Sequence, residues 1–183
     1  MVCQRCIDAV SEILNTRQIE VLNIDLGKVE ICADLNQTDW SDLKKALMER
    51  GFGLIEDKDK QLVDQIKTAI IQMIHQSDKT VHVKNSVYLS QQLGINYGHL
   101  SRIFSQHMQI TIEKYVILQK VEKIKEWISY QEMTLSEMAY KLGYKNLSHL
   151  SAQFKSATGM SISEFKKLPK YDRTSLDEIG ENK

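Results

Sequence analysis

One pattern occurs twice in the second half of the chain, with the two copies about fifty residues apart. The first copy reads LSQQLGINYGHLSRIFSQHMQITIEKY, from Leu89 to Tyr115, and the second reads MAYKLGYKNLSHLSAQFKSATGMSISEF, from Met138 to Phe165. When the copies are aligned, with one extra residue in the second turn, similar residues occupy equivalent positions. These pairs are Leu89/Met138, Ser90/Ala139, Leu93/Leu142, Gly94/Gly143, Leu100/Leu150, Phe104/Phe154 and Tyr115/Phe165. A long repeat unit present only twice indicates a duplicated module and not a solenoid.

Each copy has the pattern of two helices joined by a tight turn. The first helix is expected to end at Gly94 or Gly143, because glycine readily adopts the left-handed conformation found at helix C-termini. In the second helix a Leu and a Phe lie four residues apart, so they share one stripe that is expected to be buried. The pattern predicts a helix-turn-helix, a motif whose second helix enters the major groove of DNA.

Residues 62–168 resemble the DNA-binding domain of AraC/XylS-type transcriptional regulators, in which a long helix joins two helix-turn-helix units. The joining helix is expected to run from Ile112 to about Ser129, and the ending FKSATGMSISEFKKL carries the most specific part of the resemblance. Ile112 and Ile162 stand where the family usually has proline, and Gln109 stands where it usually has glycine. The resemblance implies a sequence-specific transcriptional regulator that binds double-stranded DNA in the major groove, with RNA polymerase as a further partner.

The buried stripes also predict which side chains of the two recognition helices face outward, at positions where the family contacts bases. These are Gly98, His99, Ser101, Arg102 and Ser105 in the first helix, and Leu147, Ser148, His149, Ser151, Ala152 and Lys155 in the second. Arg102 is expected to bind guanine through two hydrogen bonds, and Lys155 to bind phosphate. The serines have a second interpretation, as solvated side chains without a partner.

The charge of the chain is uneven although its net charge is zero. Residues 80–170 hold 12 Lys and Arg against 6 Asp and Glu, a net charge of +6, whereas residues 1–79 have a net charge of −4. Phosphate binding requires such a positive segment. Chance asymmetry among solvated side chains is the alternative explanation.

The first 57 residues have a different spacing of apolar and polar residues, which predicts the order helix, strand, strand, helix, strand. A helix follows the loop at Cys3, and a hairpin is expected to turn at Leu26-Gly27-Lys28. The second helix is expected to be capped by Asp39 and to stop at Gly51. A last short strand is expected at 52–55.

This front segment resembles the heavy-metal-associated domain, a small ferredoxin-like α/β sandwich. The resemblance rests on Met1-Val2-Cys3-Gln4-Arg5-Cys6 as the MxCxxC loop and on Gly51-Phe52 before the last strand. The family's first strand, which is central in its sheet, has no counterpart here, and a sheet without it has unpaired backbone groups. Either the physiological start lies upstream of Met1, or the domain is rearranged, or another chain supplies the strand. The expected fold class is therefore α+β, with a front domain at 1–57, an all-α double helix-turn-helix domain at 58–169 and a disordered tail at 170–183.

Cys3 and Cys6 are the candidate metal ligands. Two thiolates at a helix N-terminus can converge on a soft ion such as Cu(I) or Zn. Two alternatives remain open: a redox pair that closes a disulfide, and a structural or partner-binding role such as homodimerisation. Cys32 is expected to be a small buried hydrophobe, and His75 a helix-terminal or a solvated histidine and not a ligand.

Other function classes find less support in the sequence. No acid/base constellation accompanies the CxxC pair, so we do not expect an enzyme. No apolar run approaches the ~20 residues that span a bilayer, and no signal peptide is visible, so a cytoplasmic protein without membrane contact is expected. The rival interpretation is a metal-handling or redox CxxC protein with a helical docking domain.

Overall fold

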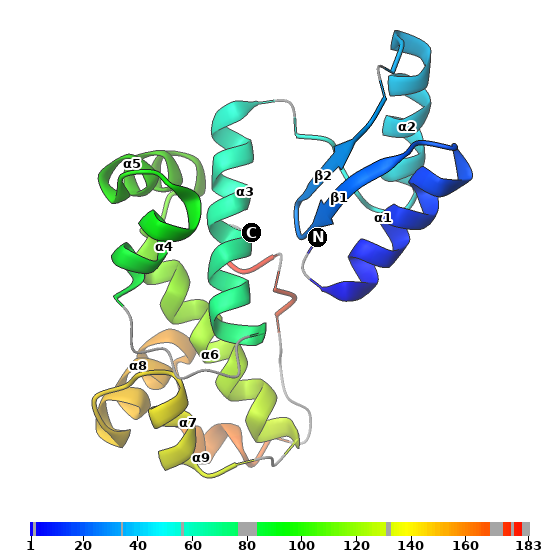
Figure 1. Ribbon diagram of the computed structural model, residues 1–183. Coiled ribbons are helices and arrows are strands. Elements are labelled where there is room, and N and C mark those ends of the chain that lie inside the picture. Colours follow the sequence, from blue (N-terminus) through cyan, green and yellow to red (C-terminus); the bar gives the residue numbers. More distant parts are fainter. Residues whose placement is uncertain are drawn as a thin grey trace. The chain divides into compact units, whose positions relative to one another are not determined.

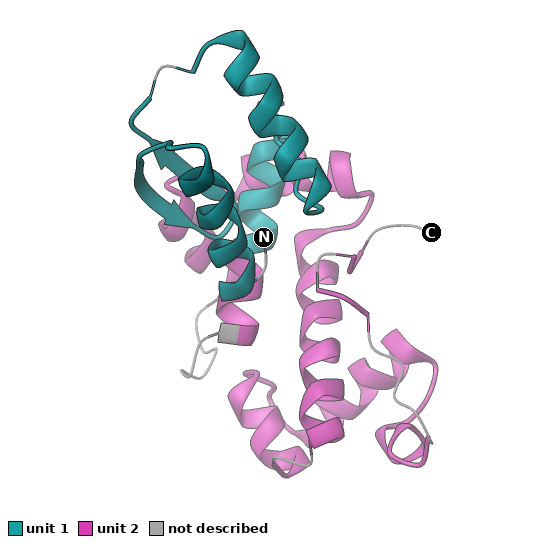
Figure 2. Ribbon diagram, turned by 90° about the vertical axis from the view of Figure 1, so that its right-hand side faces the viewer, with its two compact units in different colours: residues 1–68 teal, residues 69–183 magenta. Residues whose placement is uncertain are grey.

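The computed structural model describes residues 1, 3–33, 35–55, 57–76, 84–130, 133–168, 174–176 and 178–180. The chain divides into two compact units, Met1–Thr68 and Ala69–Lys183, which Figure 2 shows in different colours. Helix α3, Lys58–Ile71, crosses the boundary between them and continues into a π-helical turn, η1, at Gln72–Gln76.

Before α3 begins, the front unit contains two helices and one hairpin (Figure 1). Helix α1 spans Gln4–Thr16, strand β1 Val21–Asp25, strand β2 Lys28–Ile31 and helix α2 Gln37–Glu49. The strands are antiparallel and pair Asp25 with Lys28, so the predicted hairpin is confirmed, and Gly27 takes the positive φ of 81° in its turn. The register shifts between Val21 and Asn23, which leaves Leu22 bulged outward and 64% exposed.

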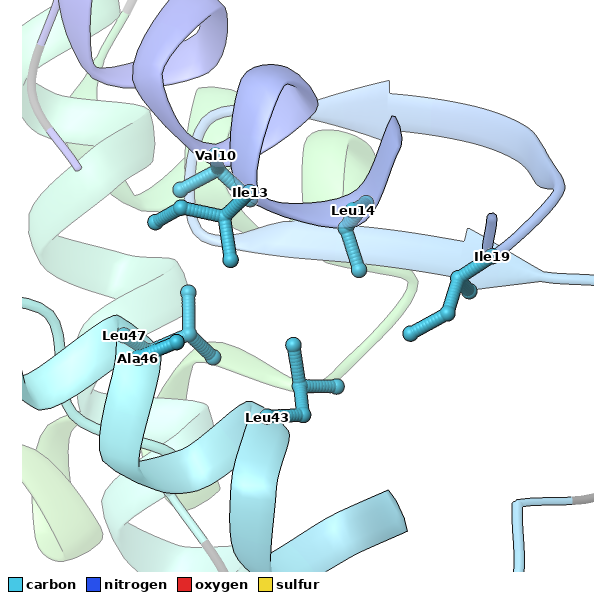
Figure 3. Close-up of a cluster of buried hydrophobic side chains, with 7 residues drawn as sticks. All are labelled: Val10, Ile13, Leu14, Ile19, Leu43, Ala46 and Leu47. Carbon is cyan, nitrogen blue, oxygen red and sulfur yellow. The ribbon is translucent and has the colours of Figure 1, made fainter. Parts of the chain in front are cut away.

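The core of the front unit forms where the two helices face each other. Figure 3 shows Val10, Ile13 and Leu14 of α1 and Ile19 pointing toward side chains of α2. The α2 side chains are Leu43, Ala46 and Leu47, and all seven residues of this cluster are buried. The apolar spacing of both helices therefore determines the packing of this unit.

The sheet of the front unit is smaller than expected. Among the described residues it contains only two strands, so a ferredoxin-like sandwich is not confirmed. The predicted strand at 52–55 is wrong, because this stretch has no regular structure. Instead, the Phe52 backbone N–H donates to the Leu47 carbonyl at 2.8 Å, which turns the chain back at the end of α2.

Two further predictions in the front unit are corrected. Asn36, not Asp39, caps α2, since its side chain accepts hydrogen bonds from the backbone N–H groups of Thr38 and Asp39. Cys32 is exposed and not buried. It follows the half-buried Ile31, and the alternation of a strand places it with Glu30 on the solvent face.

The second unit is helical and is organised around one long helix. Helix α6, Ile112–Tyr130, has α4 and α5 near one end and α7, α8 and α9 near the other (Figure 1). The bounds are Asn85–Leu93 for α4, Tyr97–Met108 for α5, Leu135–Lys141 for α7, Leu147–Thr158 for α8 and Ile162–Phe165 for α9. The predicted joining helix is thus confirmed to within one residue of its expected end.

The duplication seen in the sequence recurs in the packing. The side chains of Phe104 and Phe154 are fully buried, and each meets an aromatic ring at the equivalent position of its own copy. The ring centroids of Phe104 and Tyr115 are 5.4 Å apart, those of Phe154 and Phe165 are 5.5 Å apart, and both pairs are edge-to-face. In each copy, an aromatic pair at equivalent positions packs the recognition helix against the helix that follows it.

The first copy ends its recognition helix at a residue that suits the conformation poorly. Gln109 has a left-handed backbone with φ 58°, and the equivalent residue of the second copy, Gly159, has φ 79°. We expect Gln109→Gly to raise the free energy of unfolding by about 0.5–1 kcal/mol, because glycine adopts this conformation without a Cβ clash. Urea unfolding would measure the change, and Gly159→Ala should lower stability by a similar amount. A destabilising Gln109→Gly would contradict this reasoning.

The C-terminal segment also differs from its prediction. Residues Thr174–Leu176 and Glu178–Gly180, which we call the C-terminal strap, were expected to be disordered with the rest of the tail. The side chain of Ile179 in this strap is only 4% exposed, so an apolar side chain anchors it within the second unit.

Candidate nucleic-acid interface

Both recognition helices begin at an asparagine that accepts a hydrogen bond from the first turn. The Asn96 side chain accepts from the Gly98 backbone N–H at 2.8 Å, and the Asn146 side chain accepts from the His149 backbone N–H at 2.9 Å. These caps satisfy donors that a helix start leaves unpaired and fix where α5 and α8 begin. In each copy, an Asn four residues before the buried Leu is the sequence signal for this cap.

In the first recognition helix, α5, the predicted contact residues lie on the surface. Gly98, His99 and Arg102 are exposed, and Ser101 and Ser105 are half-buried. A guanidinium nitrogen of Arg102, Nη2, lies 3.4 Å from Nδ1 of His99 one turn earlier. The structure thus places a long cationic side chain and a histidine side by side on the outward face of α5.

The second recognition helix, α8, presents a different surface. Leu147, Ser148, His149, Ala152 and Lys155 are exposed, and Ser151 is half-buried. The His149 ring packs edge-on against Tyr144 in the preceding turn, with centroids 5.5 Å apart. The alignment of the two copies pairs Arg102 with Ala152 and Ser105 with Lys155. Arg102 therefore lies about one turn closer to the start of its helix than Lys155 does.

A contact that the sequence did not reveal ties α5 to the start of α6. The Tyr97 hydroxyl donates a hydrogen bond to the Glu113 carboxylate. Burial, and then this hydrogen bond, raise the pKa of Tyr97, while the same hydrogen bond lowers the pKa of Glu113. The equivalent positions in the second copy hold Leu147 and Ser163, so the second recognition helix has no such pair.

The second helix-turn-helix is instead attached to α6 through its turn. The Lys120 ammonium donates to the Leu142 carbonyl at 2.6 Å and lies 5.1 Å from the centroid of the Tyr144 ring. Burial lowers the pKa of Lys120 and raises the pKa of Tyr144 to about 12. Lys120 therefore holds the turn of the second helix-turn-helix against α6, a role that the charge count could not reveal.

The candidate metal ligands lie together at the start of α1. The Sγ atoms of Cys3 and Cys6 are 3.6 Å apart, with Cys3 exposed and Cys6 half-buried. In the part of the chain that the structure describes, no group of three His, Cys, Asp or Glu residues is placed to hold a metal ion. The pair fits a two-coordinate thiolate site for a soft ion better than a closed tetrahedral zinc site.

Within the residues that the structure describes, no helix combines the length and the apolar character that crossing a bilayer requires.

Comparison with known proteins supports the assignment of the second unit. Residues 89–168 match a helix-turn-helix domain family, a range that contains both copies of the repeat and the helix between them. The chain is also 23% identical over 166 residues to the uncharacterized HTH-type transcriptional regulator YtdP of Bacillus subtilis (strain 168). That alignment covers 88% of this chain but 21% of the relative, so the chain spans about a fifth of the relative's length. No solved structure matches the chain.

Proposed function

We propose that the chain is a sequence-specific, AraC-type transcriptional regulator that reads double-stranded DNA with α5 and α8. The observation that carries this proposal is the presence of two equivalent recognition helices, one in each copy of the repeat, joined through a single long helix. Their outward faces hold exposed groups that can bond to bases, whereas their inward faces are fully buried. This is the arrangement expected of a protein that enters two major grooves in succession.

Charge and similarity support the same function. The segment with the two helices has a net charge of +6 and contains no Asp, as binding to a phosphate backbone favours. The matched family is a helix-turn-helix domain, and the relative in Bacillus subtilis is named as a transcriptional regulator. RNA polymerase is the partner that an activator of this type would contact.

Selection from a random duplex library, followed by gel-shift titration, tests the proposal. The chain should enrich one sequence and bind it far more tightly than its scrambled counterpart. Because phosphate contacts release counterions, affinity should fall about a hundredfold or more between about 50 and 200 mM salt. Failure to enrich any duplex, or equal affinity for single-stranded DNA, would contradict the proposal.

We further propose that a soft metal ion bound by Cys3 and Cys6 modulates DNA affinity or oligomeric state. The support is the short distance between the two thiols and the position of Cys3 as the N-cap of a 13-residue helix. A coupling of about 1–3 kcal/mol, or about 5–150-fold in affinity, is typical of two linked sites.

The double variant Cys3→Ser/Cys6→Ser tests this modulation, with Cys32→Ser as the matched control. Cu(I) binding, measured by competition with a chromophoric chelator, should be lost in the double variant and kept in the control. DNA affinity should respond to Cu(I) in the parent and the control only. If the parent binds DNA equally with and without Cu(I), the front unit serves docking or homodimerisation.

A further inference from the structure

Gln119, in the middle of α6, is a buried junction between distant segments of the second unit. Its side chain is 0% exposed. Its Oε1 accepts from Nε2 of His75 at 3.0 Å, and its Nε2 donates to the Tyr115 hydroxyl at 2.9 Å and to the Leu176 carbonyl at 3.1 Å. Burying an amide without hydrogen-bond partners costs free energy. Loss of any one of these contacts would therefore leave a buried polar atom of Gln119 with fewer partners and destabilise the junction. The His75 side chain is 6% exposed and lies in the last turn of η1, so of its two expected roles the helix-terminal one is confirmed and the solvated one is wrong.

The C-terminal strap contacts α6 on three successive turns. The Thr174 backbone N–H donates to the Glu122 carboxylate at 3.1 Å, and the Leu176 carbonyl accepts from Gln119. A Cβ added at Gly180 would lie 3.2 Å from the Tyr115 ring. Residues 122, 119 and 115 share one face of the helix, so the strap runs antiparallel to α6 along that face.

The far end of the strap is seated tightly against the first helix-turn-helix. Gly180 has a positive φ of 81°, and an added Cβ would lie 2.8 Å from Cδ1 of Ile110, which follows α5. The positive φ disfavours any residue with a Cβ, and an added Cβ would have to displace the end of the Ile110 side chain. The Glu122 carboxylate at the other end is 5% exposed and also accepts from the Lys125 ammonium at 2.6 Å, so that end is anchored as well.

The strap therefore lies between the two copies of the repeat. Thr174, Ile179 and Gly180 line one cavity together with Thr158 of α8 and Phe165 of α9, and Gly180 also lies against Ile110, where the first helix-turn-helix ends. A joining helix alone can bend and can rotate at its ends, whereas a segment packed between the two copies restricts both motions. The separation and angle of two recognition helices decide which spacing of half-sites a protein accepts.

We propose that the C-terminal strap, held by Gln119 and Glu122, is a positioning element that fixes α5 relative to α8 and thereby sets the half-site spacing the protein accepts. The described contacts of the strap are with α6 and Ile110, so it acts on the recognition helices through these residues. This inference rests on the proposed DNA-binding function, but its geometric part can be measured without DNA.

The first experiment compares spacing preference in three forms of the full chain. The probe is the duplex selected by the parent, together with versions whose spacer is one or two base pairs longer or shorter. Truncation after Arg173 removes the strap, Gly180→Val unseats it without changing charge, and truncation after Gly180 is the matched control that keeps it. We expect the parent and the control to favour the selected spacing by about tenfold or more, and the two strap variants to favour it by less than about threefold.

Two other outcomes would overturn the proposal. The segment 174–183 has a net charge of −2, so a purely electrostatic role predicts tighter binding of the shortened chain to every duplex, with spacing preference intact. A merely structural role predicts a lower melting temperature with an unchanged spacing preference. If the parent binds no duplex at all, it is the proposed function that fails.

A second measurement tests the positioning role without DNA, so it applies even if the parent binds no duplex, and a milder variant serves where Gly180→Val folds poorly. Spin labels at Gln106 of α5 and Ser156 of α8, both exposed, report the distance between the recognition helices. We expect the distance distribution to be clearly broader in Gly180→Val and in the milder Gly180→Ala than in the parent. Equal widths in well-folded Gly180→Ala and parent, shown by equal far-ultraviolet circular dichroism, would refute the positioning role whether or not DNA binds.

Discussion

Replacing Phe104 with alanine should lower the free energy of unfolding of the second unit by about 3–5 kcal/mol. The Phe104 side chain is 0% exposed and meets the Tyr115 ring edge-to-face, so the substitution removes both buried apolar area and an aromatic pair. A loss of this size is a large part of the stability of an ordinary domain. Urea unfolding followed by tyrosine and tryptophan fluorescence would measure it.

The second copy of the repeat provides the matched control. Phe154→Ala removes the equivalent ring, whose partner is Phe165, and should cost a similar amount. If Phe104→Ala cost less than about 1 kcal/mol while Phe154→Ala cost the expected amount, the core of the first copy would not be packed as described.

Replacing Arg102 with alanine should weaken binding to the selected duplex by about 1–3 kcal/mol and relax preference at one base pair. Arg102 is the only arginine on either recognition helix, and a guanidinium can bind O6 and N7 of guanine at once. Its position next to His99 restricts where the guanidinium can lie before DNA arrives. Gel-shift titration against the selected duplex and its single-base variants would measure both effects.

Lys155→Ala is the control for a phosphate contact. It should weaken binding to all sequences by similar factors and reduce the slope of log affinity against log salt by about one. If Arg102→Ala behaved in that same way, with equal losses on every sequence, Arg102 would be assigned to phosphate and the source of specificity would lie elsewhere on α5 or α8.

The helices of the second unit were predictable because local signals agree with the packing. Gly94 and Gly143 both have φ 67°, as expected of residues that end the first helix of each motif. Leu100 and Leu150 are fully buried, as their spacing to Phe104 and Phe154 predicted. Repetition reinforced each signal, since the same residue type recurred at the equivalent position.

The polar contacts were not predictable, because their partners are far apart in the sequence. Gln119 bonds to His75 and Leu176, and nothing about a glutamine within an amphipathic helix distinguishes a buried amide from a solvated one. The sequence likewise did not predict the burial of Glu122 on the same helix, which is only 5% exposed. The prediction of a strand at 52–55 was wrong for a different reason. Its local residues suit a strand, but no described strand lies beside it to pair with.

The different attachment of the two recognition helices has a consequence for how new binding specificities could arise. Helix α5 begins with Tyr97, whose hydroxyl is bonded to Glu113, so a change at its first residue also disturbs the start of α6. Helix α8 is attached through Leu142 and Tyr144 in its turn, which leaves the exposed Ser148 and Ala152 outside that attachment. Substitutions at these two positions should therefore be tolerated by the scaffold. We therefore expect substitutions on α8 to change its proposed base preference with less loss of stability than a substitution of Tyr97 on α5.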